Sequence, residues 1–222
     1  MFERYAIYFT PQGDLARYGA TWLGWDVATG KPVAHPLVGD LDLADLTQTP
    51  RKYGFHGTIK PPFHLAAGTD LAGLSKALAH LTGRFARVEM AGLQVSRLGR
   101  FLALTPVGDA DALARLAGEA VMRLDPFRAP PTTAELARRR ASPLSPAQDR
   151  NLRDWGYPHV LDTFRFHMTL TGRLKTPDAI LPLVAAHFAP CLPTPFVIDS
   201  LTLVGQRTDG MFEEIQRYTL AG

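Results

Sequence analysis

The spacing of apolar residues divides the chain into strands and helices that follow one another in a repeated order. Alternation of polar and apolar side chains predicts strands, and apolar residues three and four apart predict helices. We expect strands over residues 4–10, 53–60, 85–96, 101–105, 164–172, 196–205 and 212–220. We expect helices over residues 12–25, 41–46, 70–81, 109–124 and 177–188. Pro61 and Pro62 directly follow the second strand and are expected to end it.

The order of these elements indicates an internal duplication. His167 follows His56 by 111 residues, whereas Phe101 follows Arg4 by 97. The two halves match if the second carries an insertion of about 14 residues. A duplicated unit of this size predicts two similar lobes that face each other.

The predicted fold class is therefore α+β, with two antiparallel sheets flanked by helices around a central groove. The whole chain, residues 1–222, is expected to form one bilobed domain. Its halves are predicted at about residues 1–98 and 99–222, with a Pro- and Arg-rich insertion within about 126–159.

Composition narrows the class of protein. The 222 residues are 46% apolar and 20% charged, which describes a folded globular chain with a real core. The net charge is only +3, but 19 arginines against 5 lysines suit a local site for an anionic ligand. The single cysteine, Cys191, excludes an internal disulfide and a cysteine-based zinc cluster. With no apolar run of membrane length, we expect a cytoplasmic protein that does not bind a membrane. We expect a monomer whose partner is a small phosphorylated substrate, with RNA ends as the alternative.

The candidate chemistry lies in two His-x-Thr tripeptides, one in each half. His56 and Thr58 project from one face of their strand, and His167 and Thr169 from one face of theirs. Two motifs with such apolar flanks arise by chance at roughly the 1% level. Because imidazole titrates near neutrality, one histidine can take a proton while the other gives one.

The same strand alternation predicts further groups beside the histidines. Thr58 and Thr169 can donate hydrogen bonds to phosphate oxygens as negative charge builds up. By parity the predicted substrate-binding residues are Lys60, Arg165, Thr171 and Arg173. Neither motif has a second ligand at metal spacing, so we expect no metal and no cofactor.

These motifs resemble the 2H phosphoesterase superfamily, which includes 2′-5′ RNA ligase-like proteins and 2′,3′-cyclic phosphodiesterases. Longer strings resemble its branch associated with phosphonate-utilisation genes. These strings are residues 4–9, 22–26, 51–56, 60–63 and 166–172. The resemblance implies a bilobed α+β fold and metal-independent attack on phosphoesters. It also implies catalytic roles for His56, Thr58, His167 and Thr169, and it implies no particular substrate.

The sequence therefore favours a phosphodiesterase acting on a small cyclic phosphate or a 2′-linked nucleotide. It leaves open which histidine is the base. One alternative is a protein that binds a nucleotide or RNA phosphate without turnover, and another is an RNA ligase that joins RNA ends. The arginines at 138–140 fit either a lid over the groove or a solvated helix face beside a mobile loop. Trp22 and Trp25 fit core packing better than stacking on a base.

Overall fold

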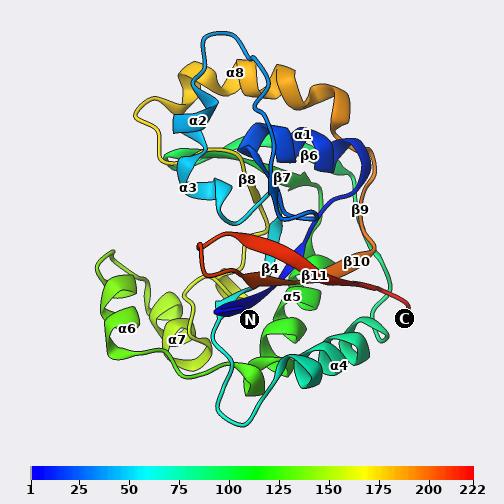
Figure 1. The fold of residues 1–222 in the computed structure, drawn as a ribbon, viewed down its shortest axis with the longest axis vertical. Helices are drawn as coiled ribbons and strands as arrows, with labels where there is room; N and C mark the ends of the chain where they lie inside the picture. Colours follow the sequence, from blue (N-terminus) through cyan, green and yellow to red (C-terminus); the bar gives the residue numbers. More distant parts are fainter. Residues whose placement is uncertain (1) are drawn as a thin grey trace.

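The protein's structure, a computed structural model, describes residues 2–222 (Figure 1). The strands are β1 (Arg4–Phe9), β2 (Trp25–Asp26), β3 (Lys31–Pro32), β4 (Gly57–Phe63), β5 (Val88–Met90), β6 (Gly92–Leu98), β7 (Phe101–Val107), β8 (Met168–Thr169), β9 (Phe196–Ile198), β10 (Ser200–Gln206) and β11 (Phe212–Thr219). The α-helices are α1 (Gly13–Leu23), α2 (Leu43–Leu46), α3 (Gln48–Arg51), α4 (Leu71–Thr82), α5 (Asp111–Arg123), α6 (Thr133–Arg140), α7 (Pro146–Trp155) and α8 (Pro177–Phe188). Short 3₁₀ turns are η1 (Asp125–Phe127), η2 (Leu161–Thr163) and η3 (Ala189–Cys191). None of the helices within residues 2–222 has the length and apolarity needed to cross a bilayer.

The predicted α+β class is confirmed, and antiparallel strands form the sheets. The largest sheet has seven strands in the order β11-β10-β1-β4-β8-β7-β6, and two further pairs are β2–β3 and β5–β9. The strands expected in two separate sheets are joined here into one. The junction is narrow, because β4 meets β8 at a single pair, Gly57 opposite Met168. Each side of that junction carries one of the His-x-Thr motifs.

Strands from the two halves of the sequence pair with each other in the folded chain. β6 and β7 pair over their full length around Gly99, whose φ of +60° suits the tight turn. The boundary expected between residues 98 and 99 therefore falls inside this hairpin. Strand β10, from the second half of the sequence, pairs with β1 of the first half. The internal duplication itself stays a prediction.

The main core lies between the sheet and the helices at both ends of the molecule. Figure 1 shows α1 and α8 at one end, α4 and α5 at the other, and the strands between them. β1 is buried on both faces: Ile7 and Phe9 join the main core, whereas Tyr8 packs with Phe212 in a smaller cluster. Trp22 is fully buried in the main core, so its predicted packing role is confirmed.

Two strands differ from their expected extents. β4 continues through Pro61 and Pro62 to Phe63, which pairs with Tyr5 of β1. Because β8 meets β4 only at Gly57, the prolines lie where β4 has one partner strand, a position that tolerates a missing N–H. β8 is only two residues long, against the nine expected, so strand alternation does not extend far beyond its histidine motif.

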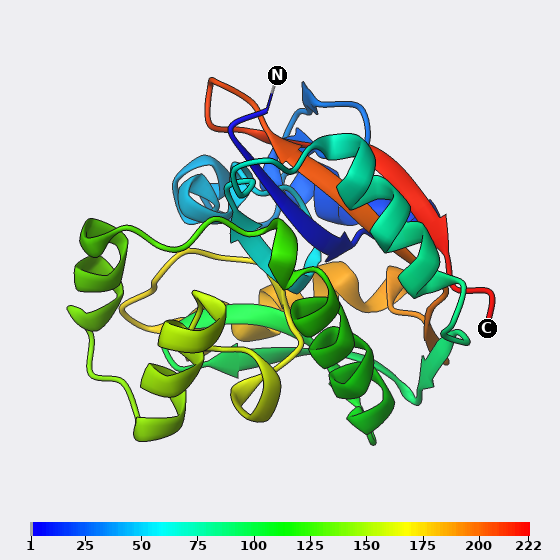
Figure 2. The ribbon, with the colours of Figure 1, turned by 90° about the horizontal axis from the view of Figure 1, so that it is seen from below.

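The arginine-rich insertion is folded into helices α6 and α7, which project to one side of the molecule (Figure 2). Each helix begins with a capping box, formed by Thr132 with Glu135 and by Ser145 with Gln148. An ion pair at 2.8 Å between Arg140 Nε and Asp149 Oδ1 links the two helices. The arginines at 138–140 form the last turn of α6, where positive charge is favourable to the helix dipole.

Candidate active site

The single pair between β4 and β8 brings the two His-x-Thr motifs together. Gly57 and Met168 are the middle residues of the motifs, and they lie directly opposite each other on antiparallel strands. Antiparallel register therefore places His56 beside Thr169 and Thr58 beside His167. Both middle residues are buried, and the histidines and threonines project from the opposite face. Neighbours in such a row stand about 5 Å apart at Cβ.

Both imidazoles are held in the same orientation by their own backbones. His56 Nδ1 lies 2.9 Å from the carbonyl oxygen of Gly54, and His167 Nδ1 lies 2.8 Å from that of Arg165. A carbonyl oxygen can only accept a hydrogen bond, so each Nδ1 carries a proton and is the hydrogen-bond donor. This tautomer leaves Nε2 of each neutral ring as a base. The Thr58 hydroxyl donates a hydrogen bond to His56 Nε2 over 3.0 Å.

Tyr8 packs face to face on the first histidine. The ring centroids of Tyr8 and His56 are 3.7 Å apart with an interplanar angle of 20°. Tyr8 also lies directly opposite Thr58 across the β1–β4 pair. Its phenol oxygen is buried and has no hydrogen-bond partner within residues 2–222. The sequence did not identify Tyr8 as part of the site.

Burial has the largest effect on the pKa of both histidines. It lowers the pKa of His56 to about 4, with a smaller lowering from the nearby His167 and an opposing contribution from the Gly54 carbonyl. Burial also lowers the pKa of His167, the Arg165 carbonyl opposes this, and the Arg165 charge lowers it further. Both rings are therefore neutral at pH 7 in the free protein. An anion bound between them would favour their protonated forms.

Lys60 does not lie on the histidine face, which corrects its predicted role. Lys60 pairs with Ile7 and Thr58 pairs with Tyr8, so one extra residue, Ile59, forms a bulge between them. Because Ile7 and Tyr8 project to opposite faces of β1, Lys60 and Thr58 do so on β4. Lys60 is 2% exposed, and its Nζ donates to the Val121 carbonyl oxygen at 2.9 Å.

Replacing Lys60 with methionine should therefore spare the reaction. Asp125, which lies 3.6 Å from Lys60 Nζ, keeps its closer ion pair with Arg128 at 2.7 Å. Burial lowers the pKa of Lys60 to about 8, which shows that its charge is costly at this position. We expect Lys60→Met, where the variant folds, to change kcat/KM less than about twofold, because Lys60 does not face the histidines. A tenfold loss of kcat/KM in a folded variant would contradict this placement.

The three other predicted binding residues differ in their burial and in their place relative to the second motif. Thr171 is 1% exposed, its hydroxyl accepts from Leu102 N at 3.0 Å and donates to Gly172 O at 2.9 Å, so it is a structural group. Its predicted substrate role is wrong because β8 ends at Thr169 and the alternation stops there. Arg173 is exposed on the segment that follows. Arg165 is exposed directly before the second motif and stays a candidate.

The insertion adds side chains that the sequence did not identify as part of the site. The guanidinium of Arg139 lies 4.3 Å from the ring centroid of Tyr157, and Tyr157 meets His159 edge to face at 5.9 Å. Gln148 Nε2 lies 3.3 Å from His159 Nδ1. Burial, and then the nearby His167, lowers the pKa of His159. The end of the insertion therefore lies close to the second motif, although its sequence carries no signal at catalytic spacing.

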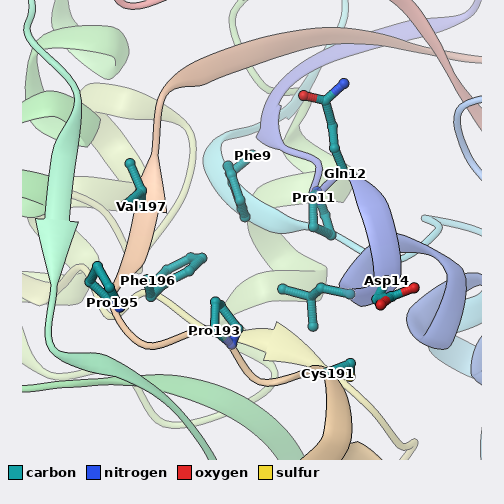
Figure 3. Close-up of a pocket in the computed structure, with 10 residues that line it drawn as sticks. Phe9, Pro11, Gln12, Asp14, Cys191, Pro193, Pro195, Phe196 and Val197 are labelled. Carbon is teal, nitrogen blue, oxygen red and sulfur yellow. The ribbon is translucent and has the colours of Figure 1, made fainter.

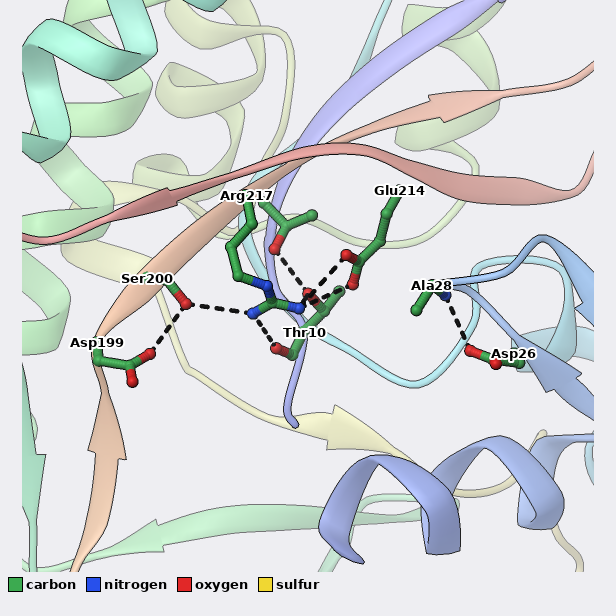
Figure 4. Close-up of polar contacts among 8 residues, drawn as sticks. Thr10, Asp26, Ala28, Asp199, Ser200, Glu214 and Arg217 are labelled. Atoms are coloured by element: carbon green, nitrogen blue, oxygen red, sulfur yellow. Dashed lines mark hydrogen bonds and ion pairs between the residues drawn. The ribbon is translucent and has the colours of Figure 1, made fainter. Parts of the chain in front are cut away.

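An arginine network fixes the end of β1 beside the site (Figure 4). Arg217 donates to the backbone oxygen and the hydroxyl of Thr10, both at 2.8 Å, and pairs with Glu214 at 3.0 Å. The Thr10 and Thr202 hydroxyl oxygens are 2.6 Å apart. Since Phe9, the residue before Thr10, pairs with Gly57, this network holds the strand against which the first motif packs.

A separate hollow near the start of α1 offers no comparable chemistry (Figure 3). Its volume is about 320 Å³, and Phe9, Phe196 and three prolines make up half of its lining residues. Burial raises the pKa of the Cys191 thiol in its wall to about 11, so this sulfur is not a nucleophile near neutrality. Across residues 2–222, no three His, Cys, Asp or Glu side chains gather in a group that could hold a metal ion.

Comparison with known proteins gives one family and two curated relatives. The model of a family described as a protein of unknown function, DUF1045, matches residues 58–213. The chain is 37% identical over 231 residues to ribose 1,5-bisphosphate phosphokinase PhnN of Janthinobacterium sp. (strain Marseille), covering 99% of this chain and 51% of that protein. It is 36% identical over 190 residues to PhnN of Laribacter hongkongensis (strain HLHK9), covering 83% and 44%. The chain thus spans about half the length of the curated relatives it matches.

Two solved structures are similar to this chain over its full length, at low sequence identity. The apo form of E. coli LigT has a TM-score of 0.49 and 14% identity, covering 100% of this chain and 99% of that chain. E. coli LigT complexed with 3′-AMP has a TM-score of 0.47 and 15% identity, covering 100% of both chains.

Proposed function

The chain belongs to the DUF1045 family, a 2H-like family, and from this premise we propose that it is a metal-independent phosphodiesterase. In this proposal it hydrolyses a small cyclic phosphate, with His56 and His167 as its acid–base pair. The supporting observation is the pair Gly57–Met168, which places both histidines and both motif threonines on one face of the sheet. The Nδ1 contacts to backbone carbonyls leave both Nε2 atoms for the reaction.

The proposed step transfers two protons and breaks one phosphorus–oxygen bond. One neutral histidine takes a proton at Nε2 from water as the water oxygen attacks phosphorus. The bond from phosphorus to one ester oxygen breaks, and the other, protonated histidine gives its proton to that oxygen. Thr58 and Thr169 donate hydrogen bonds to the non-bridging oxygens. The product is a phosphomonoester with a free hydroxyl, and the histidines have exchanged protonation states.

The curated relatives suggest which cyclic phosphate to test first. Their name contains ribose 1,5-bisphosphate, which carries a phosphomonoester at C1 next to a free 2-hydroxyl. Hydrolysis of 5-phosphoribose 1,2-cyclic phosphate at its bond to O2 would release this compound. We therefore place 5-phosphoribose 1,2-cyclic phosphate beside 2′,3′-cyclic nucleotides as the candidate substrates.

Turnover of this panel tests the proposed function directly. The purified protein is incubated with each cyclic phosphate, with and without EDTA, and products are followed by phosphorus NMR. We expect conversion of at least one cyclic phosphate to a monoester at a rate that EDTA does not change. Loss of activity on chelation, restored by Mn²⁺ or Zn²⁺, would contradict the metal-independent mechanism. Binding without turnover would favour a phosphate-binding protein, and joining of 2′,3′-cyclic phosphate and 5′-hydroxyl RNA ends would favour a ligase.

The rate should depend on pH in a direction set by the two histidines. The reactive form has one neutral and one protonated imidazole, and the pKa of each ring lies below 6.5 in the free protein. We expect kcat/KM to be highest between about pH 4 and 6.5 and to fall about tenfold per unit at higher pH. Initial rates at low substrate concentration from pH 5 to 9 measure this profile. A constant kcat/KM from pH 6 to 9 would show that histidine protonation does not control the reaction.

A further inference from the structure

A polar hollow of about 470 Å³ lies beside the second motif, on strands β6 and β7. Its volume falls in the range of small-molecule sites, and it exceeds what one phosphate group needs. Gln94, Ser96 and Thr105 contribute from the strands, Phe164 and Arg165 from the segment before β8, and Asp111 from the start of α5.

Strand register connects this hollow to the histidine face. Ala103 of β7 lies opposite Thr169, and Leu104 lies opposite Met168, so the next residue, Thr105, falls beside His167. Gln94 pairs with Thr105 and so shares the same face. Arg165 also lines the hollow, and its carbonyl oxygen accepts from His167 Nδ1 at 2.8 Å. The hollow therefore begins directly beside one of the two proposed acid–base groups.

The lining suits sugar hydroxyls and a second anion. The hydroxyl oxygens of Ser96 and Thr105 are 2.7 Å apart, and Gln94, which carries an amide, is the cross-strand partner of Thr105. Asp111, an exposed residue that also lines the hollow, can accept from a hydroxyl but would repel a phosphate. Arg97 is ion-paired with Asp178, whereas the Arg165 guanidinium has no hydrogen bond or ion pair to any residue of 2–222. A second phosphate would therefore bind at Arg165 rather than at Asp111.

We propose that this hollow binds the part of the substrate beyond the reacting diester, and that this part is a phosphorylated sugar. Arg165 binds the second phosphate, and the Ser96–Thr105 pair with Gln94 binds sugar hydroxyls. Among residues 2–222, Phe164 is the one partly exposed aromatic residue that lines the hollow, beside the buried Phe166, which favours a sugar over a stacked nucleobase. This assignment rests on the proposed phosphodiesterase function, because it names the substrate of that same site.

Two matched substrates separate the hollow from the reacting centre. Ribose 1,2-cyclic phosphate and its 5-phosphorylated form differ only in the second phosphate. We expect Arg165→Gln to lower kcat/KM for the 5-phosphorylated compound about 10- to 100-fold more than for the unphosphorylated one, mostly through KM, because only the first presents a phosphate to the guanidinium. Arg87→Gln, at an exposed arginine outside the hollow, should change neither. Equal effects of Arg165→Gln on both substrates, or a wild-type preference for 2′,3′-cyclic AMP, would overturn the sugar-phosphate assignment while leaving the phosphodiesterase intact.

A binding measurement keeps the two proposals distinguishable if no substrate is turned over. Ribose 5-phosphate lacks the diester, and in titration calorimetry the variants Arg165→Gln and His167→Ala distinguish binding in the hollow from binding of its phosphate between the histidines. We expect wild-type protein to bind it and Arg165→Gln to bind it about 10- to 100-fold more weakly. We expect His167→Ala to retain this binding within about threefold. Absence of ribose 5-phosphate binding in the wild type would reject the assignment, whatever the outcome of the turnover panel.

Discussion

Replacing either histidine with alanine should lower turnover by about 10²- to 10⁴-fold, because each substitution removes one proton-transfer group from the proposed reaction. His56 and His167 act in the same step, so the double variant should be little slower than the slower single variant. The reason is structural: the Gly57–Met168 pair places the two motifs side by side, and each ring has Nδ1 bound to its own backbone. Single-turnover rates on the best cyclic phosphate measure the effect.

The control for this experiment distinguishes the loss of a proton-transfer group from the loss of correct folding. His56 packs on Tyr8 with ring centroids 3.7 Å apart, so His56→Ala also removes a packing contact. His56→Gln keeps more of that contact while removing the titrating ring, and it should be as inactive as His56→Ala. Circular dichroism and thermal melts show whether each variant folds. Activity within tenfold of wild type in folded His56→Gln and His167→Ala would reject the two-histidine mechanism.

Replacing Gly57 with alanine should damage both stability and catalysis, because a side chain at this position overlaps the ring of Phe166. Phe166 is 4% exposed and packs against Phe9 and Phe196, with centroid distances of 6.3 and 6.0 Å, so the ring has little room to move. Overpacking of this kind costs about 1–3 kcal/mol. A shift of about 1 Å between the motifs would lower kcat about 100-fold. Denaturant melts and steady-state rates measure the two effects.

A second substitution tests whether the overlap is the cause. Phe166→Leu removes the outer part of the ring, so the double variant with Gly57→Ala should be more stable than the sum of the two single effects by about 0.5–3 kcal/mol. Gly83→Ala is the matched control, since its new methyl group would lie 3.4 Å from the nearest atom. If Gly57→Ala matches wild type in both stability and rate, the close packing at the junction does not position the motifs.

Local patterns determined most of the secondary structure. The helix expected over residues 177–188 is α8 with the same bounds, because its start at Pro177 and its apolar spacing are properties of adjacent residues. Asp70, the first residue of the helix expected over residues 70–81, accepts from Gly73 N as a helix cap does. The β6–β7 hairpin follows from Gly99 in the same way. Helices α6 and α7 were missed as elements, although both capping boxes were readable in the sequence.

Strand parity was reliable only where the strand stayed regular. It placed His56 with Thr58 and His167 with Thr169 on common faces, and the register of β4 against β8 agrees with that placement. It failed for Lys60, because a bulge at Ile59 reverses the alternation. A bulge arises from pairing with another strand, and adjacent residues carry no signal for it.

The sequence by itself determined the α+β class, and it determined that the histidine and threonine of each motif share one strand face. Both depend on spacing within one segment. Only the tertiary structure decided that β4 and β8 meet at one pair, and that Tyr8 packs on His56. It also decided that the hollow beside His167 is lined by β6 and β7. These contacts join segments tens of residues apart, and their geometry is fixed by how the strands order themselves in one sheet.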